Sequence, residues 1–368
     1  MDSVQIGVDA LRDLLESGRP VTVLDIRPAQ QRKEWHIPGS RHFEGIKALH
    51  QGSSPGGGLG LPADGTVVAV CAHGNSSLFA VEALRRQGIP ALSLQGGMQA
   101  WSLAWNLADV EVPGSAAQIV QVRRTGKGCL SYIVASNGQA AVIDASVDAD
   151  VYLRIAAERG WRITHAIDTH VHADHLSRSR VLAERCGATV CMPEQKRTSY
   201  EHHALRDGDS IRVGEIEIRA IHTPGHTLES TSYMVDERAL ITGDTLFPAA
   251  VGRPDLAANP EQAKQRAHAL YATLQKLLAL PAETLILAGH TSEPIAFDGA
   301  PVCATLAQAR AAIAMLGAPE DGFVEILLGR IPATPPNHIQ IVQLNEAGQF
   351  PGGDPTELEA GANRCAIA

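Results

Sequence analysis

The chain has 368 residues, enough for two or three domains, and its 45% hydrophobic content can build real cores. Its formal net charge of -9 disfavours nucleic-acid and anionic-membrane partners, because phosphate groups bind clustered Lys and Arg. The sequence shows no secretory signal, no apolar stretch long enough to span a membrane and no C-x-x-C pair. These features predict a soluble, cytoplasmic protein with reduced thiols.

Strands and helices alternate in the first hundred residues. Buried-strand runs at Val21–Ile26, Val67–Val70 and Ala91–Leu94 are interleaved with helical spacing at Val8–Glu16 and Leu78–Gln87. This alternation predicts a small α/β domain with a parallel sheet.

Cys71 is the candidate functional residue of this region. It opens the loop Cys71–Ser77, C-A-H-G-N-S-S, between a predicted strand and a helix. Backbone N–H groups at a helix N-terminus stabilise a thiolate, and Gly74 lets the loop curl so that these groups point inward. The loop therefore predicts a cradle for a thiolate, a persulfide or an oxyanion, and the alternative is a buried structural cysteine. We interpret the other cysteines as structural: Cys129, Cys186, Cys191, Cys303 and Cys365.

The region resembles the rhodanese family of sulfurtransferases, and we expect such a domain over residues 1–108. The resemblance rests on the loop and on three further motifs, L-D-I-R at Leu24–Arg27, H-I-P-G-S at His36–Ser40 and Q-G-G-M-Q-A-W at Gln95–Trp101. It implies that Cys71 is the nucleophile that becomes a persulfide. It also implies a sulfur-binding loop made of Ala72, His73, Gly74, Asn75 and Ser76. Many relatives have Arg where this chain has Ser76, which disfavours a phosphatase role.

The second half begins after Asp109–Ala117, a stretch of Pro, Gly and small residues that is typical of a linker. Ile119–Arg123 and Cys129–Ala135 are expected to form a hairpin, and helical stretches at Val151–Arg159 and Ser177–Cys186 separate further strands. This order predicts stacked sheets flanked by helices.

A histidine-rich loop follows the predicted strand Ile163–Asp168. Its sequence, T-H-V-H-A-D-H at Thr169–His175, contains four potential ligands: His170, His172, Asp174 and His175. Imidazoles with carboxylates are the ligand set of zinc and non-haem iron. The pattern predicts a metal site, and the alternative is a solvated histidine-rich turn.

Three later side chains are expected to join this loop. Each directly follows a glycine, and two of them end a predicted strand, so close backbone approach is possible there. They are His226, Asp244 and His290.

The ordered motifs T-H-x-H-x-D-H, T-P-G-H-T, T-G-D-T and A-G-H resemble the metallo-β-lactamase fold over residues 117–355. The resemblance implies an αββα sandwich with metal at one sheet edge. The expected fold is therefore an α/β rhodanese domain followed by an αββα metallo-β-lactamase sandwich. This fold hosts several unrelated reactions and does not choose among them.

One metal arrangement is that of a hydrolase with two zinc ions. The first ion would be bound by His170, His172 and His226. The second would be bound by Asp174, His175 and His290, with Asp244 bridging both ions, and a metal-bound hydroxide would attack a thioester or amide.

The other arrangement is that of a dioxygenase with one Fe(II) per chain. The iron would be bound by His170, His226 and Asp244, which leaves open positions for O2 and a sulfur substrate. The remaining ligand candidates would orient these ligands and move protons: His172, Asp174, His175 and His290. Spacing alone does not choose between the two arrangements.

Resemblance favours the dioxygenase. Thr245–Leu256 is similar to the G-R-x-D stretch of persulfide dioxygenases, which implies that Arg253 shapes a thiol-substrate pocket, and Pro332–Val342 resembles the tail of rhodanese-linked members. A persulfide on Cys71 also makes chemical sense beside a domain that oxidises persulfide sulfur to sulfite. Sulfite can then accept a sulfane sulfur and become thiosulfate.

The predicted function is a sulfide-detoxifying, Fe(II)-dependent persulfide dioxygenase with a rhodanese domain. Its small-molecule partners would be O2, sulfite or thiosulfate, and the persulfide of glutathione or of another thiol such as coenzyme A. A di-zinc thioester hydrolase of glyoxalase II type is the alternative enzyme. In a third hypothesis, the first domain only carries sulfur or senses persulfide. The sequence leaves open whether the chain forms a homodimer.

Overall fold

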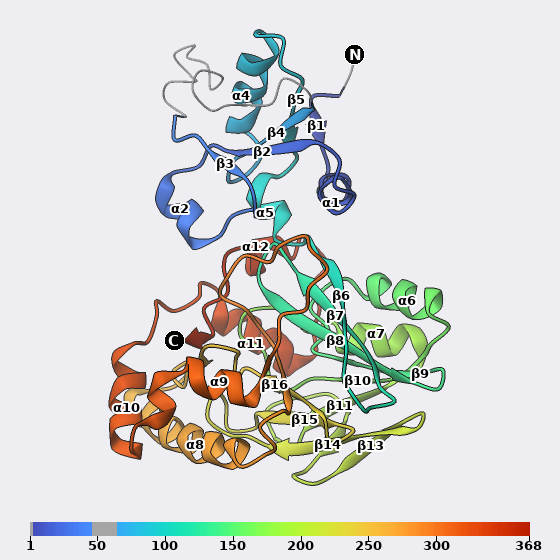
Figure 1. Cartoon of the computed structure of the whole chain (residues 1–368), viewed down its shortest axis with the longest axis vertical. Helices are drawn as coiled ribbons and strands as arrows, with labels where there is room; N and C mark the ends of the chain where they lie inside the picture. Colours follow the sequence, from blue (N-terminus) through green and yellow to red (C-terminus); the bar gives the residue numbers. More distant parts are fainter. Residues whose placement is uncertain (1–2, 46–64) are drawn as a thin grey trace.

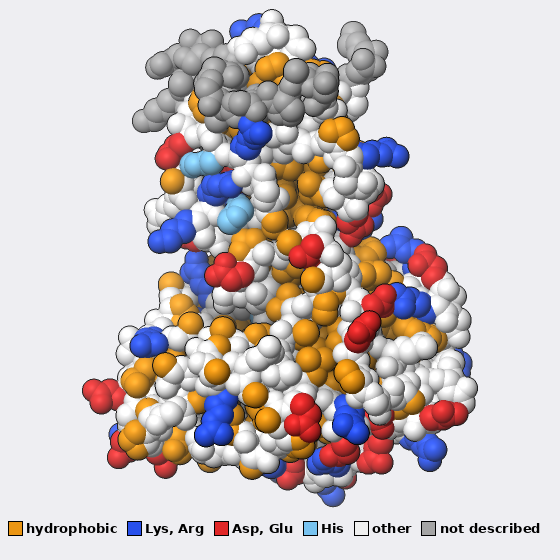
Figure 2. Space-filling model, viewed as in Figure 1, with side chains coloured by type: hydrophobic (Ala, Val, Ile, Leu, Met, Phe, Trp, Pro, Cys, Tyr) orange, Lys and Arg blue, Asp and Glu red, His pale blue; other side chains and the backbone are white. Residues whose placement is uncertain are grey.

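The computed structural model describes residues 3–45 and 65–368. Figure 1 shows a smaller N-terminal part stacked on a larger second part. Hydrophobic side chains run across the junction of the two parts on the face shown in Figure 2. From the second part, Phe297 and Ala362 pack against the N-terminal core that contains Met98 and Trp101. The two parts therefore share apolar packing.

The N-terminal part is built on five parallel strands in the order β1-β5-β4-β2-β3. The strands are β1 (Gln5–Ile6), β2 (Val21–Asp25), β3 (Arg41–His42), β4 (Thr66–Val70) and β5 (Ala91–Leu94). The helices described are α1 (Val8–Glu16), α2 (Ala29–Glu34), α4 (Ser76–Arg85) and α5 (Gly97–Trp101). Along β4, Val68 faces a core cluster with Leu11 of α1, whereas Val67 faces one with Leu84 of α4. Both faces of the sheet are thus covered, as the apolar strand runs predicted.

Two stacked sheets form the second part. The first, in the order β12-β11-β10-β9-β8-β7-β6, contains β6 (Asn106–Val110), β7 (Gln118–Arg124), β8 (Cys129–Ser136), β9 (Gln139–Ile143), β10 (Arg162–Ile167), β11 (Thr189–Pro193) and β12 (His203–Leu205). The second, in the order β13-β14-β15-β16-β18-β19, contains β13 (Ser210–Val213), β14 (Ile216–His222), β15 (Thr231–Val235), β16 (Ala239–Gly243), β18 (Leu285–Ala288) and β19 (Ala304–Thr305).

Apolar residues join these sheets to each other and to helices. Tyr132 and Tyr233 belong to the cluster between the sheets, whereas Ile133 packs with Tyr152 of α6 (Ala149–Glu158) on the outer face. Helix α7 (Ser179–Cys186) covers the same outer face. The second sheet is covered by α8 (Pro260–Leu278), α9 (Leu306–Ala312), the 3-10 helix η1 (Ala314–Gly317) and α10 (Glu320–Gly329). These layers confirm the predicted αββα sandwich. Among the residues described, no helix is both long and apolar enough to span a membrane.

The chain enters the second part earlier than the sequence predicted. Strand β6 pairs with β7 as the edge of the first sheet, so Asn106–Val110 precedes and overlaps the stretch predicted as a linker. The C-terminal residues after 355 also belong with the second part. After α11 (His338–Ala347), the segment forms α12 (Thr356–Glu359) at the junction (Figure 1) and then β20 (Ala366–Ile367), which pairs with β17 (Val251–Gly252).

Candidate metal centre and cysteine loop

The histidine-rich loop leaves the end of β10, and the buried carboxylate of Asp144 helps to hold it. Asp144 accepts hydrogen bonds from the backbone N–H of Thr169 at 2.7 Å and from its hydroxyl at 2.9 Å. Gly243 packs against the same threonine, and a Cβ there would lie 2.5 Å from Thr169 Oγ1. Its φ of +50° favours glycine as well. The loop side chains predicted as ligands are all buried: His170, His172, Asp174 and His175.

One set of ligand atoms comes from three separate segments. His170, His226 and Asp244 bring atoms within 4.8 Å of one another. Nε2 of His170 lies 3.9 Å from Oδ2 of Asp244, and Nε2 of His226 lies 3.6 Å from the same oxygen. We call these three residues the first metal position.

The second nitrogen of each histidine is already bonded, and this sets the tautomer. Because Thr169 donates its hydroxyl proton to Asp144, its oxygen accepts at 2.8 Å from Nδ1–H of His170. Nδ1–H of His226 donates to the carbonyl of Arg253 at 2.8 Å. Each Nε2 therefore keeps its lone pair free. Burial lowers the pKa of both imidazoles, which keeps the rings neutral as a metal requires.

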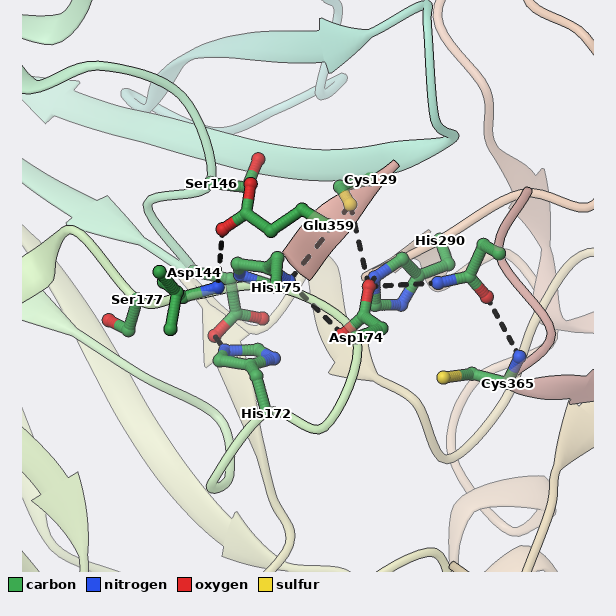
Figure 3. A network of polar contacts seen from close by, with 12 residues as sticks. Cys129, Asp144, Ser146, His172, Asp174, His175, Ser177, His290, Glu359 and Cys365 are labelled. Carbon is green, nitrogen blue, oxygen red and sulfur yellow. Dashed lines mark hydrogen bonds and ion pairs between the residues drawn. The ribbon is translucent and has the colours of Figure 1, made fainter. Parts of the chain in front are cut away.

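Asp174, His175 and His290 bring ligand atoms within 4.8 Å of one another (Figure 3), and His290 also contacts the other oxygen of Asp244. Nδ1 of His290 hydrogen-bonds with Oδ1 of Asp244, and its Nε2 lies 2.8 Å from Oδ2 of Asp174. Nδ1 of His175 lies 3.1 Å from Oδ1 of Asp174. Burial alone would lower the pKa of His290, but Asp174 and Asp244 raise it well above its usual value. We call this group, with the shared Asp244, the second metal position.

His172 is oriented by other carboxylates. Its Nε2 lies 3.1 Å from Oδ1 of Asp144 and 3.9 Å from Oδ1 of Asp168. Its ring lies beside that of His170, with 4.3 Å between the centroids. Nδ1 is consequently the atom that His172 has free for a metal.

The buried donor atoms support a metal site. Within the described residues, those without a hydrogen-bond partner include Nε2 of His170 and His175, Nδ1 of His172 and Oδ2 of Asp244. A buried polar atom without a partner costs about 1–3 kcal/mol, so several of them side by side are typical of residues that bind a metal. Nitrogen and oxygen donors of this kind fit zinc or non-haem iron.

Two thiols that the sequence analysis treats as structural also reach this centre. Sγ of Cys129 lies 3.5 Å from Oδ2 of Asp174, and the backbone of Cys129 forms an isolated antiparallel bridge with His290. Cys365 brings its sulfur within 4.8 Å of ligand atoms of Asp244 and His290. No motif in the sequence connects these cysteines to residues so distant along the chain. All six cysteines are free thiols.

The cysteine loop is a second site, in the N-terminal part. Cys71 follows β4, and its Sγ accepts a hydrogen bond from the N–H of Gly74 at 3.1 Å and lies 3.3 Å from Oγ of Ser77. A Cβ on Gly97 would lie 2.4 Å from the carbonyl oxygen of Cys71, so only glycine lets the following turn close on the loop. Ser77 lies one residue beyond the predicted set. Of the other predicted loop residues, Ala72 and His73 line a cavity, whereas Asn75 and Ser76 lie at the start of α4.

Both parts match known families. Residues 7–104 match the rhodanese-like domain. Residues 124–290 match the metallo-beta-lactamase superfamily, and this range contains every histidine and aspartate of both metal positions. The chain carries a rhodanese-like domain followed by a metallo-beta-lactamase domain. The expected fold is thereby confirmed for both domains.

Curated relatives of the metallo-beta-lactamase domain are named hydroxyacylglutathione hydrolase. The protein from Rhizobium johnstonii is 37% identical over 156 residues, which are 42% of this chain and 57% of the relative. The protein from Rhodospirillum rubrum is 35% identical over 158 residues, 42% of this chain and 58% of the relative. The chain therefore spans a little over half the length of these relatives.

Solved structures resemble the same domain. A metallo-beta-lactamase from Staphylococcus aureus subsp. aureus COL is 28% identical, with a TM-score of 0.58 over 64% of this chain and 74% of that chain. ETHE1 from Myxococcus xanthus is 30% identical, with a TM-score of 0.55 over 62% of this chain and 98% of that chain. Both support the αββα assignment.

The C-terminal segment links the rhodanese-like domain to the metal centre. Beside the cysteine loop, a cavity of about 330 Å³ is lined by His73 and Gln99 of the rhodanese-like domain and by Thr356 and Gly361 of this segment. Nδ1 of His73 lies 2.6 Å from Oε1 of Gln99, and Nε2 of Gln99 donates to Thr356 Oγ1 at 3.4 Å. The cysteine loop therefore faces the tail of the other domain.

Glu359 anchors the same C-terminal segment to the metallo-beta-lactamase domain. Its carboxylate accepts the N–H of Leu176 at 2.7 Å and pairs with two arginines that are also buried, Arg124 and Arg178. Arg124 donates in addition to the carbonyl of Ser102 at 2.7 Å. Burial alone would raise the pKa of Glu359, but the two arginines lower it to about 2.

Arg253 holds the tail of the metallo-beta-lactamase domain. Its guanidinium forms a bidentate pair with Asp255 and donates to the carbonyls of Pro332, Ala333 and Arg364. All five N–H groups of this side chain thus have protein acceptors. That Arg253 shapes a substrate pocket stays a prediction. Because its N–H groups are bonded to the protein, Arg253 would shape such a pocket by fixing the segments that it contacts.

Proposed function

We propose that the chain oxidises the persulfide of a low-molecular-weight thiol to sulfite at one Fe(II) held by His170, His226 and Asp244. The reaction RSSH + O2 + H2O → RSH + H2SO3 breaks the S–S bond, and the outer sulfur supplies the four electrons that reduce O2. The observation that carries the proposal is the combination, in one chain, of a buried two-histidine, one-carboxylate set and a cysteine whose sulfur accepts a backbone N–H of its own loop.

When bound, iron with two histidines and one carboxylate supplies open positions at which O2 and a sulfur ligand react. The chain's own residues would keep this set in place. Thr169 and the carbonyl of Arg253 hold the two imidazoles in the tautomers that leave Nε2 free. Burial of the ligands keeps bulk water away from them.

Cys71 would exchange sulfur with the product. A Cys71 persulfide gives its outer sulfur to sulfite, so that the S–S bond of thiosulfate forms, the persulfide bond breaks and the electron pair returns to the Cys71 thiolate. The N–H of Gly74 and the hydroxyl of Ser77 lie where they can donate to the negative charge on that sulfur.

The comparisons support parts of this proposal. Similarity to ETHE1 extends over 98% of that chain and fits the proposed reaction. The name hydroxyacylglutathione hydrolase supports glutathione as the thiol that carries the persulfide. Both supports concern the metallo-beta-lactamase domain alone.

Oxygen consumption by iron-loaded protein with glutathione persulfide and coenzyme A persulfide tests the proposal. We expect stoichiometric sulfite, and Cys71→Ser should keep oxygen consumption within about twofold because the two sites share no ligand. The same variant should lose sulfur transfer from thiosulfate to cyanide. Iron-loaded protein that consumes no O2 with either persulfide would contradict the proposal.

A specific observation favours thioester hydrolysis as the second candidate. The two oxygens of Asp244 face two different ligand sets, as a residue bridging two metals would do, and the curated relatives are named as hydrolases. Protein with two zinc ions per chain that hydrolyses a hydroxyacylglutathione thioester, without O2 uptake on persulfides, would establish this alternative.

A further inference from the structure

Cys365, interpreted from the sequence as a structural cysteine, is buried at the metal centre. Its side chain is 1% exposed, and its sulfur lies within 4.8 Å of ligand atoms of both Asp244 and His290. Figure 3 shows Cys365 beside His290 and Asp174. The thiol thus lies against the second metal position.

Four hydrogen bonds hold the backbone around Cys365 in this place. Its N–H donates to Oδ1 of Asn363 at 2.8 Å, and its carbonyl accepts the N–H of Arg253 at 3.0 Å. Nδ2 of Asn363 donates to Oδ2 of Asp174 at 2.9 Å, and Nη1 of Arg253 donates to the carbonyl of Arg364 at 3.1 Å. One side of the tail is therefore bonded to a ligand candidate and the other to Arg253. These hydrogen bonds fix the position of the thiol through its backbone.

The surroundings of the thiol suit a metal ligand. Oδ2 of Asp244 is buried without a hydrogen-bond partner among the described residues, and Nε2 of His290 contacts only the carboxylate of Asp174, at 2.8 Å. Cys365 also packs in a small apolar cluster with Ala173 and Val342. In such a dry site a thiolate needs a positive partner, and a divalent ion bound to a carboxylate and an imidazole provides one.

We propose that Cys365 is a thiolate ligand of a thiophilic divalent ion, zinc or a substitute such as cobalt, at the second metal position. Asp244 and His290 supply the oxygen and nitrogen ligands beside it. On binding, the S–H bond breaks, a metal–sulfur bond forms and one proton is released, without any change in oxidation state. The proposal concerns occupancy of the second position, so it stands with either candidate reaction and does not depend on the first position holding iron.

Cobalt substitution of the full chain tests this proposal with a matched pair of variants. A thiolate on Co(II) gives a charge-transfer absorption in the near ultraviolet. We expect this band in the wild-type protein and in Cys129→Ser, and its loss in Cys365→Ser. Zinc affinity of the second position should also fall by more than about 10-fold in Cys365→Ser, since even partners outside the ligand shell change metal affinity 10–100-fold.

X-ray absorption spectroscopy of the zinc-loaded wild-type protein identifies the atoms bound to zinc without any mutation. We expect a sulfur neighbour at about 2.3 Å from zinc. A spectrum with only nitrogen and oxygen neighbours would overturn the proposal even if Cys365→Ser failed to fold. Loss of the cobalt band in Cys129→Ser but not in Cys365→Ser would also overturn it, and would assign the thiolate to Cys129.

Discussion

The cysteine loop and the metal centre are assembled in opposite ways. The sulfur of Cys71 is surrounded by Gly74 and Ser77 from its own loop, which is closed by the turn at Gly97. The metal centre instead collects side chains from residue 129 to residue 365. The cysteine loop needs only elements of the N-terminal part, whereas the metal centre needs both sheets of the second part and the tail to be in place.

This difference should make the two sites respond separately to mutation. A ligand substitution is expected to remove metal chemistry while sulfur transfer at Cys71 continues. Substitutions in the tail should disturb the metal centre and the junction, because Glu359 and Cys365 belong to the same segment.

The largest effect is expected from His226→Ala. It removes one of the three ligands of the first position. Activity of the iron-loaded protein should therefore fall by more than about 100-fold, which exceeds the 10–100-fold loss typical of mutating a partner outside the ligand shell. Oxygen consumption and iron content measure this loss, with His222→Ala as the control because His222 is exposed on β14. Sulfur transfer by Cys71 should be unchanged, and a parallel loss of both activities would show that the sites are not independent.

Glu359→Gln is expected to cost about 3 kcal/mol of unfolding free energy at pH 7, since it leaves two buried arginines without their carboxylate. The folded-state pKa of Glu359 is lowered from near 4.5 to about 2, so its contribution is fully present above pH 4.5 and is lost as the pH falls toward 2. Urea unfolding at several pH values measures the difference between wild type and variant. A difference that stays constant down to pH 2 would contradict this assignment.

Asp144→Asn should weaken metal binding by about 10–100-fold without removing a ligand. The carboxylate accepts from the N–H and hydroxyl of Thr169 and contacts Nε2 of His172, so it orients two ring tautomers at once. Metal titration monitored by calorimetry is the measurement, because a purely structural role would lower stability and leave the affinity of the folded protein unchanged. Asp148→Asn, at the exposed N-cap of α6, is the matched control.

The sequence predicted the candidate ligands that the structure brings together, but not the two thiols that lie beside them. His170, His226, Asp244 and their neighbours lie in short motifs beside glycines, and glycine at 243 is required where a Cβ would strike Thr169. Cys129 and Cys365 lack such a signal, because their role depends on how β8 and the C-terminal tail pack in three dimensions. The stretch predicted as a linker, Asp109–Ala117, overlaps the end of β6, and composition does not reveal that β6 pairs with the next strand, β7.

Thr356→Val is expected to have the smallest effect. It removes the acceptor of the 3.4 Å hydrogen bond from Gln99, which at that length should contribute less than about 1 kcal/mol. A double-mutant cycle with Gln99→Met, followed by urea unfolding, measures the coupling. The main interaction between the domains would then be the apolar contact of Trp101 with Phe297, 6.1 Å between ring centroids. A coupling well above 1 kcal/mol would instead make this polar contact, next to the cysteine loop, a main interaction between the tail and the rhodanese-like domain.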